Sequence, residues 1–198
     1  MNRNLRIAAR TLGVATALAL GAACGSGDDA DTFVGRADAL DANLALVVDG
    51  DQVAAYLCDD GHIAEWFRGQ LADGRAELVS ADGDTRLHAT VEDGHASAEV
   101  QRDGQTVTVD AAAATGDAGL YRAEAGTGDE RVVAAWVRLN DGPDTGAQTK
   151  FIELEGDLVV QAAPRLNDAT GTVKFATGLS APIQRVDTPG FIESGVDI

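Results

Sequence analysis

The chain has 198 residues, with 15 Lys and Arg against 32 Asp and Glu, and its formal net charge is −17. This excess of acid argues against a nucleic-acid-binding protein, which needs a basic surface, and against electrostatic adsorption to anionic lipid. Two cysteines are too few for a disulfide framework or a four-cysteine zinc site. Because aromatic residues make up only 5% of the chain, we expect a core of Val, Leu and Ala.

Residues 1–23 have the pattern of a signal peptide. Arg3, Arg6 and Arg10 precede an uncharged apolar run from Leu12 to Ala23. This run is too short to cross a bilayer as a helix and is typical of a cleaved export signal. Its removal would leave 12 basic and 32 acidic residues, a net charge of −20, on a chain outside the cytoplasm.

The end of this segment, Leu20-Gly21-Ala22-Ala23-Cys24, resembles the signal peptides of bacterial lipoproteins. It departs from them in having Gly21 where Leu is common. The resemblance implies that Cys24 becomes a lipidated N-terminus, with acyl chains of the palmitate type holding the protein on the cell membrane. Two or more acyl chains give stable anchoring. Ordinary signal-peptide cleavage is the alternative, and only without lipidation could Cys24 and Cys58 form a disulfide.

Residues 24–43 are small and acidic and predict the lipidated cysteine followed by a flexible tether. A short helical turn is compatible with the spacing of Ala, Leu and Asp over residues 37–46. A single β domain is then expected over residues 44–198.

Asp-Gly pairs recur along this domain, and such pairs between alternating apolar runs favour type I′ hairpin turns. Two-residue loops at 73–74, 82–83, 93–94 and 103–104 place apolar residues opposite one another on one common face, whereas a one-residue slip would destroy the agreement. The expected pairs are Leu71 with Ala76, Leu78 with Leu87, Ala76 with Ala89, Val91 with Ala96, Ala89 with Ala98, Val100 with Val107, and Ala98 with Val109.

A loop at 49–50 would pair Leu46 with Val53. The less regular segments downstream predict strands over 119–123, 131–139, 149–154, 158–162 and 171–176. The chain is therefore expected to be all-β: an antiparallel meander that forms a closed or nearly closed β-barrel, because closure removes exposed strand edges. A two-sheet β-sandwich is the alternative.

The same register gives an outer polar row in which His88 stands between carboxylates. A second histidine, His95, pairs with Glu92. Such groups can bind a divalent metal, but opposed His–Glu pairs also stabilise the wet face of a sheet. We interpret them as cross-strand pairs and expect no metal and no cofactor. The row consists of Gln70, Glu77, His88, Glu99 and Thr108.

The densest cluster of polar and aromatic residues lies between residues 56 and 67 and is the candidate contact site for a ligand or partner. Trp66 and Phe67 are adjacent, so in a strand they point to opposite faces, and we expect one in the core and one exposed. A turn next to core residues is the simpler interpretation. The candidate residues are Tyr56, Asp59, Asp60, His62, Trp66 and Phe67.

No catalytic residues are assigned. The serines show neither a Gly-x-Ser-x-Gly elbow nor Ser-x-x-Lys, and no phosphate-binding loop is present. Cys58 is close in sequence to His62, but a free cysteine is more often a small buried hydrophobe than a nucleophile.

Tyr56-x-Cys58-Asp59, Glu65-Trp66-Phe67 and Gly119-Leu120-Tyr121-Arg122 are similar to segments of secreted actinobacterial proteins of uncharacterised role. This resemblance implies a location and no activity. We expect a non-enzymatic module that contacts another cell-envelope protein and displays an apolar or aromatic patch near Trp66. The alternatives are a carrier of a small apolar ligand inside the barrel and an extracytoplasmic hydrolase without a recognisable motif.

Overall fold

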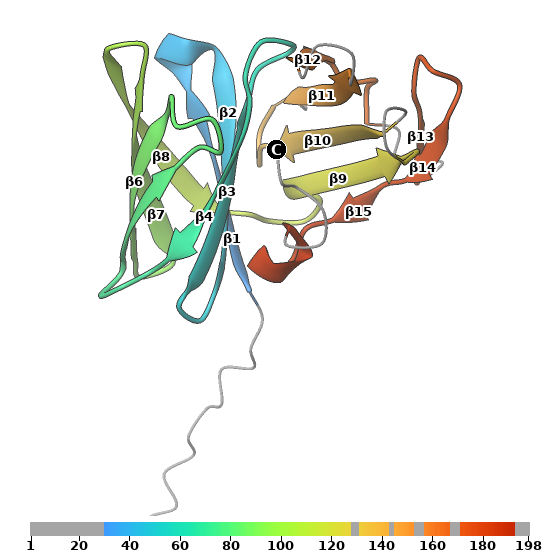
Figure 1. Ribbon diagram of the computed structural model, residues 1–198. Coiled ribbons are helices and arrows are strands. Elements are labelled where there is room, and N and C mark those ends of the chain that lie inside the picture. The colour runs from blue at the N-terminus through green and yellow to red at the C-terminus, as the bar shows by residue number, and fades with distance from the viewer. Residues whose placement is uncertain (1–29, 128–130, 143–144, 153–156, 167–170, 193–198) are drawn as a thin grey trace, which may run out of the picture.

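The computed structural model describes residues 30–127, 131–142, 145–152, 157–166 and 171–192, with only the backbone for 147–152, 157–160 and 191–192. Eight antiparallel strands and one 3-10 turn, η1, form the first sheet (Figure 1). Their bounds are β1 Asp31–Ala37, η1 Asp38–Leu40, β2 Ala42–Asp49, β3 Gln52–Cys58, β4 Ala64–Gln70, β5 Arg75–Val79, β6 Arg86–Glu92, β7 His95–Arg102 and β8 Gln105–Ala113.

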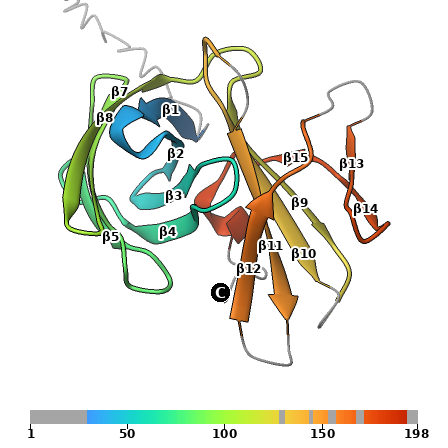
Figure 2. The ribbon, with the colours of Figure 1, turned by 90° about the horizontal axis from the view of Figure 1, so that it is seen from above.

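This sheet is a nearly closed barrel. Each strand pairs with its neighbour in the chain, and β1 also pairs with β8. Between β4 and β5 the pairing is reduced to two bridges, Phe67–Ser80 and Ala72–Arg75, which have the register expected for the turn at 73–74. The circle of strands is visible from above in Figure 2. The predicted all-β antiparallel barrel is therefore confirmed.

The Asp-Gly turns set the register as predicted on the β5–β8 side. Asp73, Asp93 and Asp103 have positive φ, as does the glycine after each, and this is the backbone of a type I′ turn. At 82–83 only Gly83 has positive φ. The predicted pairs across β5–β6, β6–β7 and β7–β8 all form.

The predicted pairing of Leu46 with Val53 is wrong. Asp49 pairs with Gln52, so the two-residue loop consists of Gly50 and Asp51 rather than Asp49 and Gly50. Gly50, with φ 60°, takes the first central position, where a type II′ turn requires glycine. Leu46 therefore lies opposite Ala55. A shift of two residues leaves every side chain on its predicted face.

The predicted tether is also wrong over residues 31–43, which form β1, η1 and the start of β2. β1 lies in the middle of the sheet, between β2 and β8, with Phe33 inside the barrel and Val34 outside, both buried. The acids of this segment lie at strand ends and in the turn, and they obscured the apolar alternation. Residues 1–29, including the predicted signal peptide and Cys24, lie outside the described residues.

A second sheet, in the order β12-β11-β10-β9-β15, contains most of the downstream strands. The barrel therefore ends with β8, and the strands predicted downstream do not belong to it. β13 and β14 form a separate hairpin, and β1, β14 and β15 were not predicted. The bounds are β9 Gly119–Ala125, β10 Val132–Arg138, β11 Thr145–Ile152, β12 Asp157–Ala162, β13 Thr172–Lys174, β14 Ser180–Pro182, β15 Gln184–Arg185 and the 3-10 turn η3 Pro189–Ile192.

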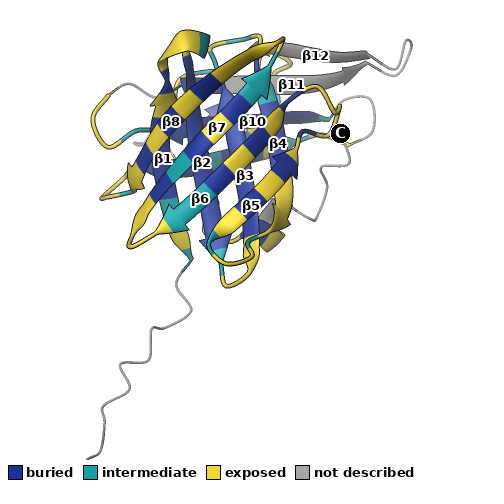
Figure 3. Ribbon diagram, turned by 90° about the vertical axis from the view of Figure 1, so that its left-hand side faces the viewer, coloured by how far each residue is buried: buried dark blue, intermediate teal, exposed yellow. Residues whose placement is uncertain are grey.

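Three apolar clusters define the layers. The first fills the barrel: its buried members are at most 8% exposed, and Leu40, Leu71 and Val91 are partly buried against them. The second lies between the outer face of β1–β4 and the second sheet, so β2 is buried on both faces. The third lies beneath the β13–β14 hairpin, where the Trp136 indole N–H donates to the Pro164 carbonyl at 2.8 Å. On β5–β8 buried and exposed residues alternate, as Figure 3 shows, because the second sheet does not cover them.

Candidate functional site

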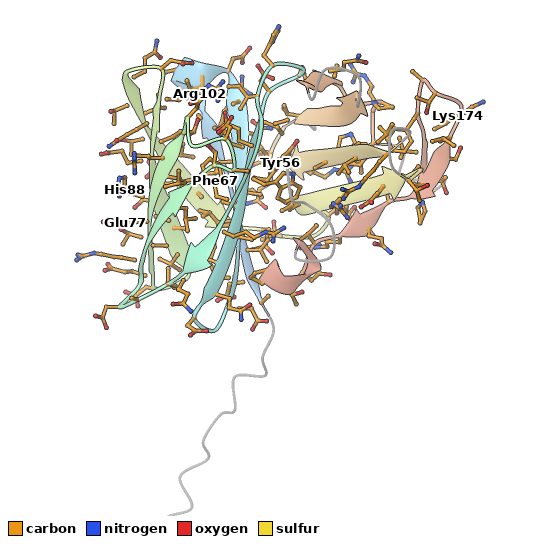
Figure 4. The ribbon with its side chains drawn as sticks, in the orientation of Figure 1. Tyr56, Phe67, Glu77, His88, Arg102 and Lys174 are labelled. Carbon is orange, nitrogen blue, oxygen red and sulfur yellow. The ribbon has the colours of Figure 1, made fainter. Side chains whose placement is uncertain are left out.

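The aromatic residues of the 56–67 segment are buried. Phe67 points into the barrel and Trp66 points outward, which confirms that the two face opposite ways. Trp66 is nevertheless only 7% exposed, because the second sheet covers it. The centroid of its ring lies 4.3 Å from the ring centroid of its cross-strand partner Tyr56. The expected aromatic surface patch near Trp66 is therefore wrong. Figure 4 shows Phe67 within the barrel and Tyr56 between barrel and second sheet.

Cys58 also faces the second sheet. Its thiol is fully buried and donates a hydrogen bond to the Thr145 carbonyl at 3.4 Å. The Thr145 hydroxyl accepts from the buried Asn43 amide at 2.8 Å. Burial raises the pKa of Cys58 well above its ordinary value, so the sulfur stays protonated. A buried, protonated thiol with a carbonyl partner has the character of a structural residue and not of a nucleophile.

Asp59 organises the connection between β3 and β4. Its Oδ1 accepts backbone N–H bonds from Gly61 at 2.8 Å, His62 at 2.5 Å and Ile63 at 2.7 Å. Partial burial raises the pKa of Asp59, but these three bonds and the nearby His62 outweigh it, so the pKa lies below its usual value of 3.8. The carboxylate is therefore ionised under all but strongly acidic conditions. Asp60 and His62 are exposed on the same loop.

The predicted outer row forms on the uncovered side of the barrel. His88 stands between Glu77 and Glu99, and its Nδ1 is 3.9 Å from a Glu77 oxygen (Figure 4). Glu92 pairs with His95. Among the described residues no group of three or more His, Cys, Asp or Glu side chains is arranged to hold a metal ion. These pairs have the geometry of ordinary cross-strand stabilisation.

One end of the barrel carries a polar cluster that the sequence analysis did not single out. The connections β1–β2, β3–β4, β5–β6 and β7–β8 meet there, because alternate connections of an up-and-down barrel lie at the same end. Glu65 of β4 and Arg102 of β7 form an ion pair across this opening, and Arg102 also donates to the Thr85 hydroxyl at 3.1 Å. Glu65 is only 8% exposed, and its Oε2 has no hydrogen-bond partner among the described residues.

An open depression of about 350 Å³ lies at this end, which we call the mouth. Its charged residues are Asp59, Arg102 and Asp103, and Arg102 Nε is 3.3 Å from Asp103. The lining combines these with apolar and neutral polar side chains from three different connections. The full lining is Ala39, Leu40, Asp59, His62, Ile63, Arg102, Asp103 and Gln105.

Two of the six candidate residues therefore contribute to this depression, namely Asp59 and His62. Glu65 and Arg102 were missed, although each interrupts an inward apolar row, before Phe67 and after Val100. A charge at an inward position was the available signal, since isolated buried charges are costly and require a partner. The two charges meet only because the barrel closes, and no short-range sequence pattern predicts that contact.

Within the described residues no helix is long and apolar enough to cross a membrane. Comparison with known proteins gives no match to a family model, a curated protein or a solved structure.

Proposed function

We propose that the protein is a non-enzymatic contact module, anchored by lipid at Cys24 on the outer side of the cell membrane, and that the mouth is its contact surface. The observation that carries the proposal is the open depression lined by Arg102, which is paired with the buried Glu65. Three separate connections build it, and its charged lining residues, Asp59, Arg102 and Asp103, are held in place by hydrogen bonds or ion pairs. Binding surfaces typically combine such fixed polar groups with apolar area.

The position of the mouth fits this role. β1 begins at Asp31, at the lower end of the barrel in Figure 1, whereas Arg102 lies at the upper end in the same orientation (Figure 4). Seven residue steps from Cys24 to Asp31 span at most about 25 Å when extended. A lipid on Cys24 would therefore hold the lower end of the barrel near the bilayer and direct the mouth away from it.

The filled barrel supports a contact module over the alternative of an apolar carrier. A water-sized space inside would leave its lining partly exposed, yet most described interior side chains are at most 3% exposed. Eight strands enclose an interior that side chains alone can fill, and here Leu, Val, Ala and Phe fill it. A ligand of any size would have to displace this core.

Site-specific photo-crosslinking in the native membrane tests the proposal. A photoreactive residue at Gln105, in the mouth, is compared with one at Gln52, which also begins a strand after a two-residue turn but at the opposite end. We expect a discrete cross-linked partner from position 105 and none from position 52. Equal products from both positions, or none from position 105, would refute a contact surface at the mouth.

Lipidation is tested separately on the protein isolated from its host. Mass spectrometry should find an acyl-modified cysteine at the N-terminus, and Cys24→Ser should move the protein from the membrane to the soluble fraction. An unmodified Cys24 on a membrane-free protein would refute the anchor.

A further inference from the structure

We infer that Asp141 is a site of spontaneous modification, at which aspartate converts to isoaspartate; this inference is independent of the proposed function. An aspartate followed by glycine is the most reactive arrangement for this change, because no side chain shields the glycine nitrogen from the neighbouring carboxyl carbon. The chain has seven such pairs, and the conformation of each decides whether the nitrogen can reach the carbon. The pairs begin at Asp49, Asp60, Asp73, Asp82, Asp93, Asp103 and Asp141.

The reaction closes a five-membered ring between the two residues. The Gly142 nitrogen bonds to Cγ of Asp141, and the bond from Cγ to the hydroxyl of the protonated carboxyl group breaks, so that this hydroxyl leaves with the amide proton as water. Water then adds at the main-chain carbonyl of Asp141 and breaks its bond to nitrogen. The product keeps the mass and charge of the parent, but its main chain runs through Cβ and Cγ and is one carbon longer.

At Asp141–Gly142 both reacting groups are without a restraint from the residues that the structure describes. The pair lies in the connection between β10 and β11, and Asp141 is exposed. Within the described part of the chain the Asp141 carboxyl group has no hydrogen bond or ion pair, and the Gly142 N–H has no acceptor. Ring closure at this pair therefore breaks no existing contact.

The type I′ turns hold their aspartates in an unreactive conformation. Asp73, Asp93 and Asp103 have φ of 50°, 51° and 51°, in the left-handed region. In that region the nitrogen of the next residue lies nearly opposite Cβ about the Cα–C bond, whereas ring closure requires the nitrogen and Cβ to be close to eclipsed. To react, each aspartate would have to leave its turn and break hydrogen bonds that close the hairpin.

The remaining three pairs are restrained by hydrogen bonds or by strand pairing. The Gly61 N–H, which would have to attack Asp60, donates instead to Asp59 Oδ1 at 2.8 Å. The Asp82 carboxylate accepts a hydrogen bond from the Ser80 hydroxyl. Asp49 is half-buried and belongs to the β2–β3 ladder. Asp141 is therefore the pair at which the folded protein offers the least resistance.

The modification would act on a contact that joins the barrel to the second sheet. Asn140, directly before Asp141, accepts hydrogen bonds at Oδ1 from the Thr115 N–H at 2.8 Å and the Thr115 hydroxyl at 3.0 Å, and it donates to the Ala113 carbonyl at 3.0 Å. Ala113 ends β8 of the barrel, and Thr115 lies in the connection to β9 of the second sheet (Figure 1). An extra main-chain carbon beside Asn140 should weaken these bonds.

Ageing the purified full chain in detergent micelles at neutral pH tests the site, with peptide mapping by electron-transfer fragmentation to distinguish isoaspartate from aspartate. We expect isoaspartate to form at position 141 roughly tenfold faster than at 93 or 103, equivalent to about 1.4 kcal/mol in the barrier. In guanidinium chloride, where the turns are lost, the three rates should become similar. Equal rates at the three positions in the folded protein, or no isoaspartate at position 141, would overturn the inference.

The variant Asp141→Glu tests the structural consequence. It keeps the charge, but its longer side chain cannot close the five-membered ring. Asp93→Glu is the matched control, and thermal unfolding of the fresh proteins should show that both fold like the parent. After ageing, hydrogen exchange of the Thr115 amide should be faster in the parent and in Asp93→Glu and unchanged in Asp141→Glu. An amide that stays protected in modified parent molecules, or loses protection equally in Asp141→Glu, would overturn the effect on the barrel–sheet contact.

Discussion

Replacing Trp66 with alanine tests the arrangement of the two sheets most directly. Trp66 is 93% buried between the barrel and the second sheet, and its ring is tilted by 36° against that of Tyr56. Truncation of a buried tryptophan typically costs about 3–5 kcal/mol, and loss of an aromatic pair lies within that range. Since small domains are stable by only about 5–15 kcal/mol, this change removes a large part of the total.

Urea denaturation followed by the fluorescence of the remaining Trp136 measures the effect. With a denaturant slope of about 2 kcal/mol/M, a loss of about 4 kcal/mol lowers the midpoint by about 2 M. Val79→Ala is the control, because Val79 is 43% exposed on β5, away from the second sheet. Its cost should stay within about 0.5 kcal/mol. A Trp66→Ala midpoint within 0.5 M of the parent (equivalent to about 1 kcal/mol at that slope) would refute the packing of the second sheet on β4.

Three further predictions follow from the same structure. Because the pKa of Asp59 is lowered in the folded protein, its ionised carboxylate stabilises the fold above the unfolded pKa, and this stabilisation is lost as the pH falls through the folded pKa. Asp59→Asn should therefore destabilise the protein at pH 7 and make its melting temperature less sensitive to acid below pH 4. An unchanged pH profile of the melting temperature contradicts this. Gly146→Ala should lower the melting temperature by several degrees, because a Cβ there would lie 2.1 Å from the Trp136 ring, and a neutral effect contradicts the close approach. Cys58 should resist iodoacetamide in the native protein and react after unfolding, and Trp66→Ala should accelerate its labelling; rapid native labelling contradicts its burial.

Much of the barrel was predictable because its register depends on local chemistry. Asp and Gly at the centre of a type I′ turn adopt the required positive φ, and the apolar alternation on either side then permits one register. The turn at Gly50 shows the limit of this argument. An Asp-Gly-Asp sequence offers two adjacent loops, and the choice between them depends on pairing along the whole of β2 and β3.

The errors have a common physical origin in burial on a second face. β1 was interpreted as tether because its acids suggested solvent, although its central residues are covered on both sides. An exposed patch near Trp66 was expected because one face of an isolated antiparallel sheet is normally wet. The second sheet changes that expectation, and its strands have irregular turns that give no local indication of where they pack.

The polar mouth shows the same limit, because its ion pair joins two residues that are far apart in the sequence. Glu65 and Arg102 are each unfavourable on an inward face when considered alone, and each becomes acceptable through the other. Replacing both with hydrocarbon would be expected to preserve the barrel, since buried ion pairs are rarely required for stability. The pair is therefore not expected to be what holds the barrel together. The double variant Glu65→Leu with Arg102→Met tests this expectation: urea denaturation should show near-parental stability, whereas a barrel that fails to fold would assign the pair a structural role.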